Sequence, residues 1–172
     1  LAALYFMLPL ALGNAVGVVV GQSIGAKNMT RARAAGLMGL ALGGAVAIVC
    51  TTALIVFRAD IAALYSPDAA VQRVAAGLLV LVALYHLADA VQVVIANALR
   101  GYKRTVIPML ISTVALWGVG LGGGYLIGLT PHWNLTGIGL VTPLGASGFW
   151  IAAIVSLSIA ALLLVWYFLA VS

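Results

Sequence analysis

Charged side chains are scarce in this chain: they make up 6% of its 172 residues, whereas 65% of the residues are hydrophobic. An ordinary soluble domain carries about 25% charged residues, so the composition excludes that class and predicts a protein of the lipid bilayer. The net charge of +5 is assigned to loops at a membrane face. Nucleic-acid binding would need a basic stripe on a soluble fold, and we expect no nucleic-acid partner.

Cysteine is nearly absent, because Cys50 is the only one in the sequence. A single thiol cannot form a disulfide framework or a four-cysteine metal site, so we interpret Cys50 as a small buried hydrophobe. The sequence also shows no pairing of a nucleophile with a base and no cluster of metal ligands. An enzyme is therefore the least favoured class, and we expect no cofactor and no metal site.

Long apolar runs take the place of these features. A membrane-spanning helix needs about 20 predominantly apolar residues, and five runs of the sequence reach that length. We predict that residues 1–172 form an all-α integral membrane protein. The five predicted spans are Leu4–Ile24, Ala34–Phe57, Val74–Leu99, Val106–Leu129 and Phe149–Val171.

The connections between these spans alternate in charge. The second connection balances two arginines against two aspartates, and the fourth carries no formal charge. The positive-inside rule places the two basic connections in the cytoplasm, so the chain begins outside and ends inside. With an odd number of spans, no initial methionine and no signal peptide, it is expected to be the C-terminal part of a longer protein. The basic side chains are Lys27, Arg31 and Arg33 in the first connection, and Arg100, Lys103 and Arg104 in the third.

Asp89 is the only acidic side chain inside the predicted spans, and it lies near the middle of the third. A carboxylate at the centre of a bilayer costs roughly 3 kcal/mol or more, so it needs a partner, a bound proton or cation, or a watery cavity. Tyr85, His86 and Gln92 lie within four residues of Asp89 and share its helical face. A hydrogen-bonded Asp that joins two helices is one interpretation, and we favour an ion- or proton-coupling site.

Two further spans carry unusual residues. Asn14 places a polar amide near the midpoint of the first span, where it either joins helices by a hydrogen bond or faces one central cavity with Asp89. Glycines at four-residue spacing in the same span predict close helix packing. In the fourth span, a glycine-rich run predicts a flexible or locally broken helix, and close packing is the alternative. These glycines are Gly13, Gly17, Gly21 and Gly25, then Gly118, Gly120, Gly122, Gly123 and Gly124.

Several stretches resemble the multidrug and toxic compound extrusion (MATE) family, in its NorM-like branch. The opening FMLPLALGNAVGVVVGQSIGAKNMTRARAAG is similar to the eighth helix and its loop, and ADAVQ…ALRGYKRTVIPM to the tenth helix and the loop that follows. The ending ALWGVGLGGGYLIGL…PLGASGFWIAAIVSLSIAALLLVWYF resembles the eleventh and twelfth helices. The resemblance implies helices eight to twelve, which form most of the C-terminal six-helix lobe of a twelve-helix transporter. The N-terminal lobe of the same protein is then an implied partner.

The resemblance also implies a function. Proteins of this family are secondary active antiporters that export organic cations and toxic compounds across the inner membrane in exchange for Na⁺ or H⁺. Asp89 matches the tenth-helix aspartate that couples ion flow, and the family's acid on the seventh helix has no counterpart here. His86 stands where many relatives have glutamine, and Gly122 where the family usually has proline. The candidates for lining the cavity or binding substrate are Asn14, Tyr85, His86, Gln92 and Tyr125, of which the tyrosines suit cation–π contacts.

Two alternatives stay open. A lipid-linked oligosaccharide flippase of the same superfamily needs a strongly cationic cavity, whereas every lysine and arginine here lies in or beside a connection. A non-transporting membrane scaffold subunit predicts that asparagine replaces Asp89 without loss of function.

Overall fold

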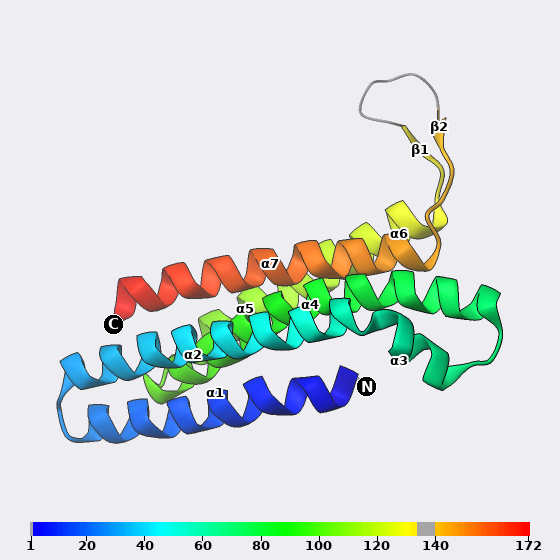
Figure 1. Cartoon of the computed structure of the whole chain (residues 1–172). Coiled ribbons are helices and arrows are strands. Elements are labelled where there is room, and N and C mark those ends of the chain that lie inside the picture. The colour runs from blue at the N-terminus through cyan, green and yellow to red at the C-terminus, as the bar shows by residue number, and fades with distance from the viewer. Residues whose placement is uncertain (1, 134–139) are drawn as a thin grey trace.

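Five long helical segments run side by side as an elongated bundle (Figure 1). The computed structural model describes residues 2–133 and 140–172. Along these residues the elements are α1 (Ala2–Gly25), α2 (Met29–Val56), α3 (Arg58–Tyr65), α4 (Ala69–Gly101), α5 (Val106–Thr113), the π-helix η1 (Val114–Gly122), α6 (Gly123–Leu129), β1 (His132–Trp133), β2 (Leu140–Val141) and α7 (Ala146–Val171).

The prediction of five membrane-spanning helices is confirmed, because five segments of the described chain are long and apolar enough to cross a bilayer. Where a side chain caps the N-terminus of a helix, the helix begins earlier than the predicted apolar run. Asn28 accepts a hydrogen bond from the backbone N–H of Arg31 at the start of α2, and Asp68 accepts one from Ala70 at the start of α4. Capping of this kind satisfies N–H groups that have no partner in the first turn. The spans are Tyr5–Gly25, Met29–Val56, Ala69–Gly101, Val106–Leu129 and Ala146–Val171.

Two small elements were not predicted. The short helix α3 connects α2 with α4, and the strands β1 and β2 pair antiparallel as a hairpin between α6 and α7. The hairpin projects sideways from the bundle, at the end where α6 and α7 meet (Figure 1). The uncharged connection also includes residues 134–139, which lie outside the described part of the chain.

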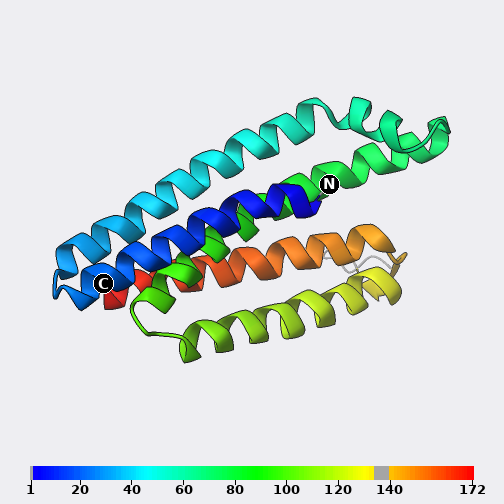
Figure 2. The same ribbon diagram turned by 90° about the horizontal axis from the view of Figure 1, so that it is seen from below.

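The helix α4 occupies the centre of the bundle, where it packs against α1, α2, α3 and α7. Figure 2 shows α2 along one edge and the α5–η1–α6 segment along the other, with α4 and α7 between them. The helix α2 is also joined to α4 by a hydrogen bond of 3.0 Å from the Thr51 hydroxyl to the Ala83 carbonyl. Asp89 is therefore carried by the central helix of the bundle. The buried apolar core is formed by Val16, Val20, Ala32, Val94, Ile95, Ala98, Leu99, Leu164 and Phe168.

Close packing at the glycines of α1 is confirmed for Gly13 and Gly17. A Cβ atom on Gly13 would lie 2.9 Å from the Asn97 side-chain nitrogen, and one on Gly17 would lie 2.9 Å from the Asn97 carbonyl oxygen. At Gly21 the nearest atoms lie 3.9 Å away, and at Gly25 none lies within 4 Å. Gly13 and Gly17 therefore permit a close approach of α1 to α4 in the middle of α1. At the end of α1, the glycines are not needed for such an approach.

The fourth span is helical throughout, and its departure from α-helical geometry is the π-helix η1. A Cβ on Gly124 would lie 2.6 Å from the Phe149 ring, and one on Gly120 would lie 2.9 Å from the Ser156 hydroxyl. At Gly118 no atom lies within 4 Å of such a Cβ. Gly120 and Gly124 therefore let the span approach α7 closely, which is the close packing given as the alternative. The other expectation was a flexible or locally broken helix, and at this place the structure has a π-helix.

A substitution at the crossing of α6 and α7 tests this packing. A Cβ on Gly148 would lie 2.8 Å from the Gly128 Cα and 2.9 Å from its nitrogen, which are backbone atoms that cannot rotate away. We expect Gly148→Ala to lower the stability by roughly 1–3 kcal/mol through overpacking. Thermal unfolding in detergent measures the effect. Gly118→Ala is the matched control, and equal unfolding temperatures for the two variants would contradict the packing described here.

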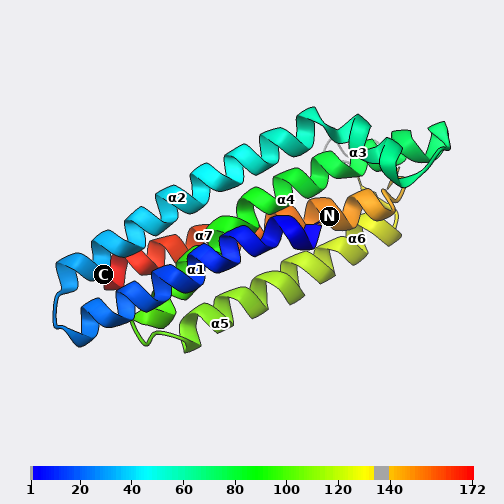
Figure 3. The same cartoon turned by 60° about the horizontal axis from the view of Figure 1, so that its bottom comes forward.

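The two basic connections lie at the same end of the bundle (Figure 3). Lys27 and Lys103, one in each connection, both adopt the left-handed backbone conformation, with φ of 56° and 59°. The next backbone N–H in each case returns to the end of the preceding helix, from Asn28 to the Ser23 carbonyl at 2.9 Å and from Arg104 to Leu99 at 3.0 Å. Glycine usually fills this position after a helix. The cytoplasmic location of this end stays a prediction.

Candidate functional site

Asp89 lies in the interior of α4 with its side chain half-buried. In residues 2–133 and 140–172, its carboxylate has no hydrogen-bond or ion-pair partner. Arg100 stands on the same helix about 16 Å further along, at 1.5 Å per residue. A carboxylate with no partner at this depth needs a proton, a cation or water to offset its desolvation. The position is therefore chemically suited to exchange a cation.

Tyr85 lies one helical turn before Asp89 and faces α7. Its ring packs edge-on against Trp150, with ring centroids 5.7 Å apart and an interplanar angle of 87°. The two rings border a pocket of about 360 Å³ between α4, η1 and α7. Its other lining residues are Leu116, Gly120, Leu121, Phe149, Ala153 and Ser156.

His86 faces α1 rather than the pocket beside Tyr85. Its ring lies edge-on to Tyr5 at 5.8 Å between centroids, and only 6% of the residue is exposed. Its Nε2 atom is buried without a hydrogen-bond partner among the described residues. A buried polar atom without a hydrogen bond costs roughly 1–3 kcal/mol, so this position of the imidazole lowers the free energy of unfolding.

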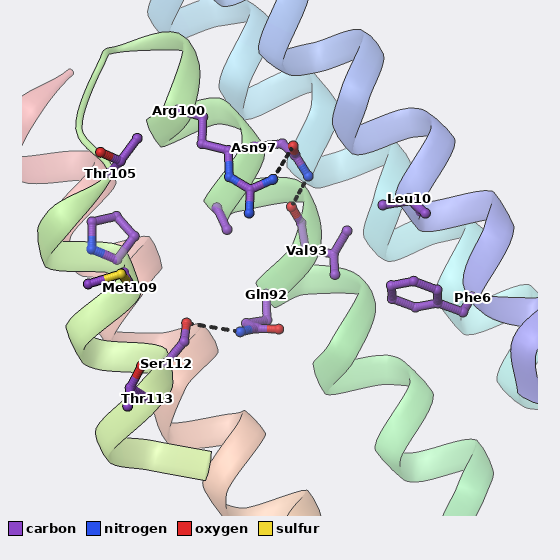
Figure 4. A pocket seen from close by; sticks show the side chains of 12 residues that line it. Phe6, Leu10, Gln92, Val93, Asn97, Arg100, Thr105, Met109, Ser112 and Thr113 are labelled. Carbon is purple, nitrogen blue, oxygen red and sulfur yellow. Dashed lines mark hydrogen bonds between the residues drawn. The ribbon is translucent and has the colours of Figure 1, made fainter. Parts of the chain in front are cut away.

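Gln92 lies one turn after Asp89 and faces α5. Its side-chain nitrogen donates a hydrogen bond of 3.1 Å to the Ser112 hydroxyl, as Figure 4 shows. This pair lines a second pocket, of about 380 Å³, between α1, α4 and α5. The other lining residues are Phe6, Leu10, Val93, Ala96, Asn97, Arg100, Thr105, Pro108, Met109 and Thr113.

The residues that share the face of Asp89 therefore meet three different neighbours. Tyr85 contacts α7, His86 contacts α1 and Gln92 contacts α5. Tyr85 thus lines a pocket that includes three aromatic side chains, and Gln92 lines a more polar one, while Asp89 itself lines neither. The two remaining candidates lie apart from both pockets: Asn14 is exposed on α1, and Tyr125 is 56% exposed on α6.

Asn97, which lines the polar pocket, was not predicted from the sequence. Asn97 is 7% exposed, and its side-chain nitrogen donates to the Val93 carbonyl at 2.9 Å. Its side-chain oxygen accepts a hydrogen bond of 3.1 Å from the Arg100 guanidinium. The spacing of three residues between an amide and an arginine was the available signal. Ser112 was also missed, since only the folded chain brings it to Gln92.

The sequence matches a known protein family. Residues 1–126 match the family model described as MatE. The multidrug resistance protein PmpM of Pseudomonas aeruginosa is 42% identical over 163 residues, which cover 95% of this chain and 33% of PmpM. The multidrug resistance protein NorM of Photobacterium profundum is 40% identical over 163 residues, which cover 95% of this chain and 34% of that protein. The chain thus spans about a third of the length of these relatives.

A solved structure shows the same fold. The crystal structure of the eukaryotic MATE transporter AtDTX14 superposes with a TM-score of 0.85 at 20% sequence identity. The superposition covers 99% of this chain and 36% of the AtDTX14 chain. At this level of identity the likeness concerns the arrangement of the helices.

Proposed function

Because this chain belongs to the MATE family, we propose that it forms part of a secondary active transporter of the inner membrane. The transporter exports organic cations and other toxic compounds in exchange for Na⁺ or H⁺. The observation that carries the proposal is the carboxylate of Asp89 in a membrane-spanning helix. Among the described residues it has no hydrogen-bond or ion-pair partner. The relatives named as multidrug resistance proteins support the class of substrate.

The mechanism follows from the cost of the buried charge. A cation or proton on Asp89 removes a desolvation penalty of roughly 3 kcal/mol. If water reaches Asp89 in one conformation of the transporter and not in the other, this penalty differs between the two conformations. Binding then shifts the equilibrium between the two conformations by that difference. Release of the ion on the inner side resets the transporter for the export of the next substrate.

The aromatic pocket beside Tyr85 is the proposed place for substrate. Tyr85, Phe149 and Trp150 line it, and the faces of aromatic rings attract organic cations, most strongly where water is excluded. Across the pocket lined by Tyr85 and the pocket lined by Gln92, Arg100 is the only basic side chain in the lining. This composition supports a cationic substrate and disfavours the flippase, which needs a strongly cationic cavity.

The test is transport by the complete protein that contains this chain. We expect purified transporter in proteoliposomes to move ethidium when a Na⁺ or a pH gradient is imposed, and to stop when that gradient is collapsed by an ionophore. Fluorescence of ethidium bound to trapped DNA reports the movement, and protein-free liposomes are the control. Equal rates with and without every gradient would contradict coupled antiport. The gradient that drives transport identifies the coupling ion.

A further inference from the structure

We propose that the pocket between α1, α4 and α5 binds the phosphate group of an anionic phospholipid, with Arg100 as its charged contact. This pocket holds about 380 Å³, which suits a headgroup and the first part of the acyl chains. It does not include Asp89, and the proposal does not depend on transport.

The first observation is that the pocket is rich in hydrogen-bond donors. Arg100 uses one guanidinium N–H on Asn97, and a guanidinium has five such donors. Figure 4 shows this group directed into the space between α4 and α5. The hydroxyls of Thr105, Ser112 and Thr113 line the same space, and no acidic side chain is among the lining residues. A phosphate group, which accepts several hydrogen bonds at once, matches these donors.

The second observation is that Arg100 is held in place. Its partner Asn97 is more than nine-tenths buried and is itself bonded to the Val93 carbonyl. Arg100 is itself exposed, and this hydrogen bond reduces the side-chain freedom that it loses when it binds a phosphate. The arginine therefore points at the pocket before any ligand arrives.

The third observation is the charge around the mouth of the pocket. The two connections that carry six basic residues both lie at this end of the bundle (Figure 3). Asp60 and Asp68 belong to the segment between α2 and α4, at the other end. Lys103 and Arg104 come shortly after Arg100, in a turn fixed by backbone hydrogen bonds. Clusters of this kind beside a membrane attract anionic lipid headgroups.

The apolar side of the pocket distinguishes a lipid from free phosphate. Phe6 and Leu10 of α1, Val93 of α4 and Met109 of α5 form walls below the guanidinium. Free phosphate would leave these walls without a contact, whereas an acyl chain covers them. A ligand with a phosphate at one end and a hydrocarbon chain at the other uses both parts.

The experiment measures lipid binding to the complete transporter in detergent by native mass spectrometry. Phosphatidylglycerol and phosphatidylcholine with the same acyl chains are added separately. We expect selective retention of phosphatidylglycerol, weakened about tenfold by Arg100→Gln, since one charge-assisted contact is lost. Arg73→Gln, at the opposite end of α4, is the matched control and should bind like the wild type.

Two more variants protect the test against misfolding. Met109→Trp fills the pocket without changing the charge and should also reduce phosphatidylglycerol binding, whereas Arg100→Lys should keep part of it. Elution volume and helicity verify that each variant is folded. Equal retention of both lipids, or an equal loss in Arg73→Gln, would overturn the proposal. Displacement of the lipid by excess inorganic phosphate would assign the pocket to free phosphate instead.

Discussion

Replacing Asp89 with asparagine is expected to abolish gradient-driven efflux by the complete transporter while its expression and unfolding temperature stay close to those of the wild type. Asparagine keeps the size and much of the hydrogen bonding of the side chain but cannot release a proton or hold a cation by charge. If Asp89 only joined helices, the amide would substitute well, since interhelical hydrogen bonds in membranes contribute about 0.6 kcal/mol on average. The measurement is ethidium efflux in proteoliposomes at matched protein amounts.

Asp60→Asn is the control for this prediction, because Asp60 is an exposed carboxylate of α3. That variant removes one negative charge outside the membrane-spanning helices and should transport at the wild-type rate. Wild-type efflux in Asp89→Asn would remove the coupling role from Asp89. The coupling acid would then have to lie in a part of the transporter beyond this chain.

The second large effect concerns the chain by itself, which is expected to show no ion-dependent efflux after reconstitution. The chain covers about a third of the length of its relatives and forms one bundle around α4. Alternating access needs two bodies that move against each other around a central site. Large side chains such as Trp117 and Trp166 are also 70% and 69% exposed on this bundle.

The complete transporter, reconstituted in parallel at the same molar amount, is the control for that experiment. Circular dichroism of the isolated chain establishes that its helices have formed before transport is measured. Sustained efflux of ethidium by the isolated chain, dependent on a Na⁺ or pH gradient, would show that one bundle suffices. The proposal of a two-lobe cavity would then be wrong.

The spans could be predicted from the sequence because each one is a long apolar run. The start of α4 at Ala69, five residues before the predicted Val74, depends instead on polar residues. Gln72 and Arg73 are too polar to be counted in an apolar run, yet Asp68 caps a helix that already includes them. Local capping therefore extends a helix beyond the part that hydropathy detects.

The candidate site could be predicted where its signal is local. A single acid in an apolar run identifies Asp89 from the sequence alone, and helical spacing places Tyr85 and Gln92 beside it. The contact from Gln92 to Ser112 spans 20 residues and depends on how α5 packs against α4. Gly120 of the π-helix likewise lies close to Ser156 of α7, far away in the sequence. Which residues meet across these helices had no signal in the sequence.

The π-helix η1 also determines how the two halves of its span are turned relative to each other. A π-helix closes its hydrogen bonds over five residues instead of four, so the side chains after it point in different directions from those of an uninterrupted α-helix. Ser112, before η1, must face Gln92, while Gly124, after it, must face Phe149. The length of η1 thus sets the rotation between the two halves of the span. Adding or removing one residue within η1 would break one of the two contacts whenever the other is kept.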